Sequence, residues 1–141
     1  MRSHGREAGP PLLTEEELNR ARYTITDLLD DLRAPRSHAE LIAAGSQLYE
    51  RLADFFLRAN RQWSARGKAI PRRLKQVDER LGAELDHGFA EMFSKGDAGP
   101  VIDLAKRILA PYGGLLFEGY RSEAPREWRR EPAGPGGSEE D

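Results

Sequence analysis

The chain has 141 residues, which is enough for one compact domain with a modest core and too few for two. Charged residues make up 33% of it and hydrophobic residues 38%, so we expect a soluble protein with a heavily charged surface. The formal net charge of −2 argues against attraction of the whole molecule to nucleic acid or membrane, and the lack of cysteine excludes disulfides and thiolate metal sites.

Both ends of the chain are rich in glycine, proline and charge and carry no hydrophobic period. We expect residues 1–13 to be a disordered, linker-like segment and residues 122–141 to be a disordered tail. The ordered domain is predicted to cover residues 14–121.

The first two predicted helices each begin at a capping box, in which a hydroxyl and a glutamate three residues later bond each other's backbone. These boxes start at Thr14 and Ser37. Pro35 ends the first helix, and the second is predicted to run to about Ala65, with Gly67 as its C-terminal cap. Two apolar rows follow the second helix: Leu41, Leu48, Leu52, Phe55 and Ala59, and beside them Ile42, Tyr49, Phe56 and Trp63.

The rest of the domain is also predicted to be helical. A short helical piece follows Pro71, Asp78 caps a third long helix, and Pro100 fits the first turn of a fourth. Pro111 and the pair Gly113–Gly114 stop that helix, and we expect a compact turn there that folds the following residues back on the domain. The sequence therefore predicts an all-α protein, a four-helix bundle of up-down type with disordered N- and C-terminal tails.

The first helix gathers polar residues on the side opposite its apolar stripe. At 100° per residue, Tyr23, Asp27 and Asp30 cluster there, with Asp31 farther round. This pattern is typical of a solvated face. It also fits a cleft wall, where a carboxylate could act as a general base, or could bind an amine or a metal through oxygen.

A run of positive charge follows the second helix. Between Asp54 and Asp78 there is no acidic residue, and seven basic residues fall in the gap: Arg58, Arg61, Arg66, Lys68, Arg72, Arg73 and Lys75. Such side chains, with the free N–H groups of a helix N-terminus, could hold phosphates. Arg58, Arg61 and Arg72 could equally balance the acidic first helix.

Arg80 and His87 form a third candidate pair. An arginine followed after four to six residues by a histidine is the ribonuclease motif of HEPN-type helical bundles, where histidine serves as acid or base and arginine stabilises phosphate charge. The pattern is short and arises often by chance, so a surface role for His87 is the competing interpretation.

Three blocks of the sequence together carry a resemblance to a known family: "RYTITDLLDDL" from Arg22, "RANRQWSARGKAIPRRLKQVD" from Arg58 and "GDAGPVIDLAKRILAPYGGLLFEGYR" from Gly96. The region from Pro10 to Arg121 resembles the helical C-terminal domain of small nucleotidyltransferase-domain proteins. Their domain plan is similar to that of kanamycin-type, or minimal, nucleotidyltransferases.

The catalytic half of that family is missing from this chain. It would carry a Gly-Ser motif followed by a pair of metal-binding aspartates, whereas Gly45–Ser46 here lies mid-helix with no acidic pair behind it. The resemblance therefore implies a binding domain that is inactive alone, whose partner is a nucleotidyltransferase catalytic domain or a second copy of the chain. ATP and magnesium are expected only with that catalytic domain, and this chain alone is predicted to hold no cofactor and no metal.

The resemblance also implies roles for individual residues. Asp27 or Asp30 would be the candidate base, with Tyr23 beside them on the substrate- or partner-binding wall. Lys68 and Arg72 would lie on the phosphate side. Two alternatives stay open: a HEPN-like ribonuclease or toxin component that uses Arg80 and His87, and a structural helical adaptor.

The expected location is cytoplasmic, without a membrane partner. No apolar run is long enough to span a bilayer, and the N-terminal residues lack the hydrophobic segment of a signal peptide.

Overall fold

The computed structural model describes residues 9–117, and all regular structure within them is helical. Five α-helices and a short 3-10 helix follow one another: α2 (Glu15–Arg33), α3 (His38–Ala59), α4 (Ala69–Val77), α5 (Glu79–Lys95), α6 (Gly99–Leu109) and η1 (Ala110–Tyr112). The predicted all-α class is confirmed. The predictions for residues 1–8, for 118–121 and for the tail 122–141 lie outside the described residues.

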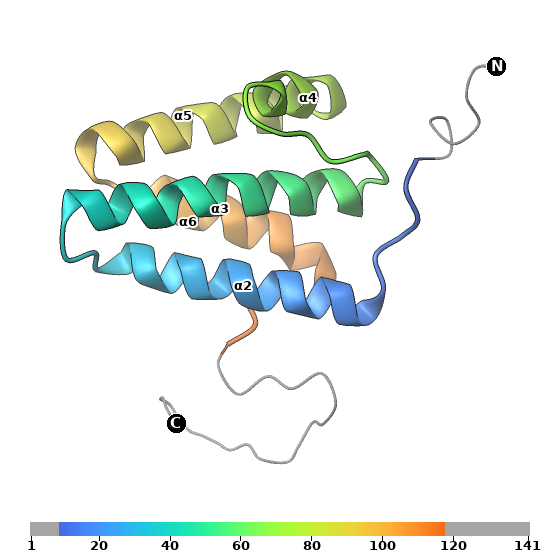
Figure 1. Cartoon of the computed structure of the whole chain (residues 1–141), viewed down its shortest axis with the longest axis horizontal. Helices are drawn as coiled ribbons and strands as arrows, with labels where there is room; N and C mark the ends of the chain where they lie inside the picture. The colour runs from blue at the N-terminus through green and yellow to red at the C-terminus, as the bar shows by residue number, and fades with distance from the viewer. Residues whose placement is uncertain (1–8, 118–141) are drawn as a thin grey trace, which may run out of the picture.

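The helices run up and down beside one another (Figure 1). α2 and α3 lie side by side in opposite directions, and α4 and α5 lie on the other side of α3, with α6 behind it. The predicted count of four is not confirmed, because α4 is a fifth helix. Pro71 fits inside the first turn of α4, where its missing N–H removes no intrahelical hydrogen bond, so the helix begins before the proline and not after it.

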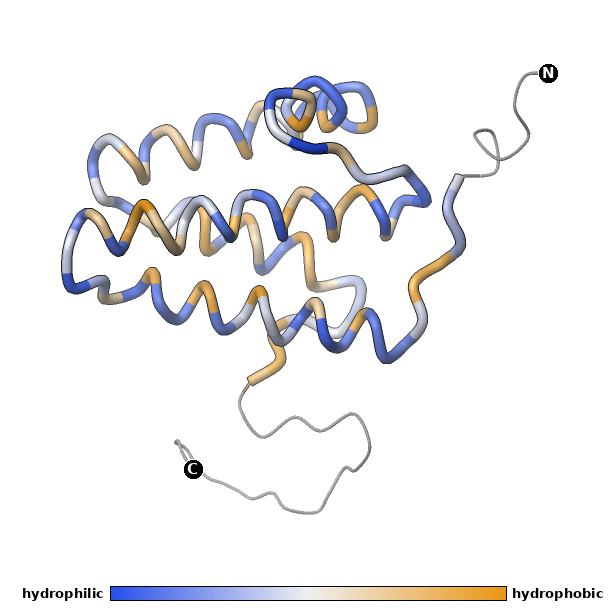
Figure 2. Tube along the Cα trace, in the orientation of Figure 1, coloured by the Kyte–Doolittle hydropathy of each residue, from blue (hydrophilic) through white to orange (hydrophobic). Residues whose placement is uncertain are grey.

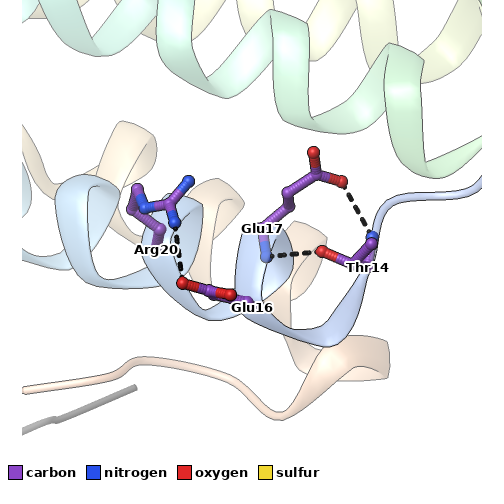
Figure 3. Close-up of polar contacts among 4 residues, drawn as sticks. All are labelled: Thr14, Glu16, Glu17 and Arg20. Atoms are coloured by element: carbon purple, nitrogen blue, oxygen red, sulfur yellow. Dashed lines mark hydrogen bonds and ion pairs between the residues drawn. The ribbon is translucent and has the colours of Figure 1, made fainter. Parts of the chain in front are cut away.

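The helix starts follow the predicted capping chemistry. At the start of α2 the Thr14 hydroxyl accepts a hydrogen bond from the Glu17 N–H at 3.1 Å, and the Glu17 carboxylate accepts one from the Thr14 N–H at 2.9 Å (Figure 3). The bond from the Thr14 backbone holds the pKa of Glu17 below its usual value, because it stabilises the ionised carboxylate. Ser37 caps α3 and Asp78 caps α5 through their side chains, which accept from the Glu40 and Leu81 N–H groups. The predicted box at Ser37 is only half formed, because the Glu40 carboxylate accepts from the Arg36 N–H instead of that of Ser37.

The end of α3 differs from the prediction. The helix stops at Ala59 and not near Ala65, because Arg61 adopts the left-handed conformation with φ of 61°. The Gln62 N–H then turns back to the carbonyl of Leu57 at 2.8 Å, so residues 60–68 form a loop. Gly67 accordingly lies just before α4 and does not cap α3.

The core forms where the apolar stripes of the helices meet. Apolar and polar positions alternate around each helix (Figure 2), and the most deeply buried side chains come from all five α-helices: Ile25, Leu29, Leu48, Leu52, Leu57, Leu74, Leu85, Met92 and Leu109. Gly45 lets α3 and α5 approach closely, since a Cβ there would lie 2.8 Å from the Met92 and Phe93 side chains.

The segment after α6 folds back onto α2, as predicted for the glycine pair. Arg22 Nε donates to the Gly114 carbonyl at 2.8 Å, and the Thr26 hydroxyl accepts from the Leu116 N–H at 2.9 Å. The same hydroxyl donates to the Arg22 carbonyl at 2.7 Å. Gly113 has a φ of +115°, and a Cβ there would lie 2.8 Å from the Arg22 guanidinium, so the turn needs glycine.

Residues 9–13, which the sequence assigns to a disordered linker, are held by the end of α3. Pro10 is fully buried, and its carbonyl accepts a hydrogen bond from Arg61 Nε at 3.1 Å. The Pro11 carbonyl accepts one from Arg58 at 3.3 Å. Contacts with the helices therefore begin before Thr14 among the described residues.

Thr26 gives a direct test of the contact between α2 and the final segment. Replacing it with valine keeps the shape but removes the acceptor of the half-buried Leu116 N–H, which costs about 1 kcal/mol of folding free energy. Thr24→Val is the matched control, because the Thr24 hydroxyl makes no hydrogen bond within residues 9–117. Urea unfolding should show a clear loss for Thr26→Val and a change within about 0.5 kcal/mol for the control; equal losses would contradict the assignment.

Candidate binding surfaces

The acidic face of α2, defined by Asp27, Asp30 and Asp31, is exposed to solvent. The sequence places Asp31 farther round the helix, but in the structure its carboxylate is near enough to Asp27 and Asp30 to be repelled by them. Partial burial raises the pKa of Asp31 above its usual value, and repulsion from Asp27, Asp30 and Glu40 raises it further. Four carboxylates, from α2 and the start of α3, therefore lie close enough to repel one another and form one negatively charged region. Tyr23 lies half-buried one turn before Asp27.

The seven basic residues between Asp54 and Asp78 divide into two groups. Four have partners within the chain. Arg58 and Arg61 hold residues 10–11, Arg73 donates to Gln62 at 3.2 Å, and Lys75 pairs with Asp86 at 3.3 Å. The expectation that Arg58 balances the first helix is supported, because its charge helps to lower the pKa of Glu17 after the Thr14 hydrogen bonds.

The second group is Arg66, Lys68 and Arg72, which we call the basic surface. All three side chains are exposed, and none forms a hydrogen bond or ion pair within the part of the chain that the structure describes. They fall within seven residues at the start of α4. Because these side chains make no hydrogen bond or ion pair with a neighbouring residue in the described part of the chain, they can bind an external anion.

The backbone at the start of α4 does not add to this surface in the way expected from the sequence. The Ala69 N–H donates to the Arg66 carbonyl and the Ile70 N–H to the Gly67 carbonyl, each at 3.1 Å. Pro71 has no N–H to offer. A phosphate at this place would therefore be bound by side chains and not by free helix N–H groups.

The structure does not bring the acidic face and the basic surface together. α2 and α4 each pack against α3, which lies between them (Figure 1). Asp27 and Asp30 accordingly lie on the opposite side of α3 from Lys68 and Arg72. A single small ligand cannot contact both sets in one chain, so they form two separate surfaces.

Trp63 does not lie in α3, although the apolar spacing predicts it in a row of that helix. It lies in the loop 60–68 and is 48% exposed. The loop is held on both sides of it, since the Ser64 hydroxyl donates to Asp54 and Gln62 accepts from Arg73. The signal that could have revealed this is Asn60, a residue type common at helix C-termini, just before the turn.

Arg80 and His87 both lie on α5 and are exposed. A spacing of seven residues places them on the same side of the helix, about 10 Å apart along its axis. Neither side chain has a hydrogen-bond or ion-pair partner among residues 9–117. The structure thus aligns the two residues without bringing them into contact.

Comparisons with protein-family models, with curated proteins and with solved structures find no match for this chain. Within the described range, no three side chains of histidine, aspartate or glutamate come together as a set of metal ligands. Nor does any helix between residues 9 and 117 combine the length and apolar composition needed to cross a bilayer.

The acidic face predicts a pH-dependent effect on stability. Because partial burial and then repulsion raise the folded-state pKa of Asp31, its ionised carboxylate destabilises the fold above that pKa, and the effect disappears as pH falls through it. Asp31→Asn should therefore stabilise the protein at pH 7, by less than about 0.5 kcal/mol because the site is exposed and screened. Urea unfolding at pH 7 and pH 3 measures this; a gain that is equally large at pH 3 would contradict the explanation.

Proposed function

We propose that this chain is a helical binding domain of nucleotidyltransferase type that is not itself catalytic. The observation that carries the proposal is the resemblance of its three sequence blocks to the helical domain of that family. Contacts between those blocks support it. Arg22 and Thr26 of the first block bond Gly114 and Leu116 of the third, so the blocks meet in one structural unit.

In this proposal α2, α3, α5 and α6 form an up-down four-helix bundle, and α4 is an addition that presents the basic surface. Asp27 or Asp30 would supply the carboxylate toward an acceptor substrate, with Tyr23 beside them. Lys68 and Arg72 would bind phosphate or an acidic region of the partner. Their lack of partners within the described residues supports this role.

The separation of the two surfaces by α3 refines the proposal. A catalytic domain that covers the basic surface would leave the acidic face of α2 to a different contact, either the acceptor or a second copy of the chain. ATP and magnesium would be held by the catalytic domain, whose aspartates align and neutralise the phosphates.

A HEPN-like ribonuclease is the second candidate, because Arg80 and His87 are exposed on the same side of α5. In that case histidine would move the proton and arginine would stabilise the phosphate charge. A structural adaptor would need neither these residues nor the charged surfaces.

Activity assays on the isolated chain separate these candidates. With ATP, magnesium and an aminoglycoside acceptor we expect no AMP transfer, because the sequence has no Gly-Ser motif followed by paired aspartates. With labelled single-stranded RNA we expect no cleavage above background. RNA cleavage that is lost in both Arg80→Ala and His87→Ala would establish the ribonuclease instead, and AMP transfer that depends on a residue of this chain would contradict a non-catalytic role.

Binding to a catalytic domain tests the charged surfaces. The partner is a nucleotidyltransferase catalytic domain encoded beside this chain or in frame with it, and affinity is measured by isothermal titration calorimetry. Lys68→Ala with Arg72→Ala should weaken binding about tenfold or more, and the effect should shrink with added salt because exposed charges are screened. Asp30→Ala and Asp27→Ala should weaken binding of a cationic acceptor.

The same variants must be checked for stability. The charge variants remove exposed side chains and should change the free energy of unfolding by less than about 0.5 kcal/mol. Leu28→Ala, on the buried stripe of α2, should cost about 2–5 kcal/mol. If the charge variants lose stability as Leu28→Ala does and binding is unchanged, their role is structural and the proposal fails.

A further inference from the structure

The basic surface lies in a long stretch of the sequence that contains no acidic residue. The stretch between Asp54 and Asp78 is the longest in the whole sequence without an acidic residue. Arg66, Lys68 and Arg72 therefore have no acidic neighbour in sequence, and none of the three forms an ion pair within residues 9–117. The Asp54 carboxylate reaches the same loop, where it accepts a hydrogen bond from the Ser64 hydroxyl. Three exposed charges of one sign attract a negatively charged group more strongly than scattered pairs do.

The loop that carries Arg66 is fixed and not loosely tethered. Its start is held by the bond from the Gln62 N–H to Leu57, and its end by the bonds from Ala69 and Ile70 to the loop carbonyls. Trp63 presents a half-exposed aromatic ring from the same loop. A segment that docks here would find charge and an apolar ring in positions that are already ordered, so little entropy is lost on the receiving side.

A segment of matching charge exists in the same chain. Residues 131–141, with the sequence "EPAGPGGSEED", contain four acidic residues and no basic residue. Two prolines in this segment, Pro132 and Pro135, are suited to packing against an aromatic ring. We propose that the acidic segment 131–141 binds the basic surface of its own chain, with its carboxylates on Arg66, Lys68 and Arg72 and a proline against Trp63.

The length of the connection permits this contact. Glu131 comes about fourteen residues after Phe117, the last described residue, and an extended chain spans up to ~3.3–3.6 Å per residue. A domain of this size has a radius of gyration of only about 13 Å. A tether of this length also gives a local concentration in the millimolar range, which favours a contact made of weak, screened charge pairs.

The acidic segment is directed to this surface by the charges elsewhere. The acidic face of α2 repels it, and on that side of α3 the carboxylates of Asp27, Asp30 and Asp31 gather with Glu40. Docking at Lys68 and Arg72 covers the residues that the proposed function assigns to phosphate or partner binding. The segment would then compete with that partner, although the contact itself does not depend on the proposed function.

Paramagnetic relaxation measures the contact in the full-length chain without any partner. The protein has no cysteine, so Ser138→Cys provides a single site for a nitroxide spin label. We expect the amide signals of residues 66–72 to lose at least half of their intensity relative to the reduced label, while those of residues 27–31 on α2 do not. In 1 M salt, where the Debye length is about 3 Å, the loss should disappear.

Charge variants on each side supply the controls. Neutralising the segment with Glu131→Gln, Glu139→Gln, Glu140→Gln and Asp141→Asn should restore the signals, and so should Lys68→Gln with Arg72→Gln. The contact is overturned if residues 66–72 are affected no more than residues 27–31, or if the loss persists in the neutralised segment. Equal broadening in a mixture of spin-labelled chain and separate isotope-labelled chain would also overturn it, since the contact would then be intermolecular.

Discussion

The hydrogen bonds of the buried Thr26 hydroxyl are the constraint on which the arrangement of the described helices depends. This hydroxyl accepts from the Leu116 N–H and donates to the Arg22 carbonyl, so it ties the residues after α6 to α2. The Arg22 side chain adds a second tie, because its Nε donates to the Gly114 carbonyl. Hydrogen bonds of this kind each contribute about 1 kcal/mol, and together they favour this path for the segment. The left-handed Gly113 provides the turn that leads from α6 to α2.

Local chemistry explains which parts of the fold were predictable from the sequence. The caps at Thr14, Ser37 and Asp78 each depend on residues within four positions, so they can be read directly from the chain. The end of α3 could not be read in this way. Its apolar spacing continues to Trp63, but the chain turns at Arg61, whose side chain bonds a carbonyl 51 residues earlier. A contact of that range leaves no periodic signal.

The same limit applies to the charged residues. The sequence identifies the seven basic positions between Asp54 and Asp78 but not which of them are already used, because the partners of Arg58 and Lys75 lie in other elements. Nor can spacing along the chain tell on which side of α3 each residue falls. The binding roles of the two charged surfaces therefore stay predictions. Because α3 separates the surfaces, they could line one cleft only with a second protein or a second copy of the chain.

The placement of α3 has an electrostatic consequence for any function of this chain. A helix with its side chains is about 10–12 Å wide, which exceeds the Debye length of about 8 Å at physiological salt. Charges on the acidic face and on the basic surface are therefore largely screened from each other. Occupation of Lys68 and Arg72 leaves the carboxylates of α2 nearly unchanged, so the two surfaces act as independent contacts. Coupling between them would have to pass through the packing of α3, where Gly45 already holds it tightly against α5.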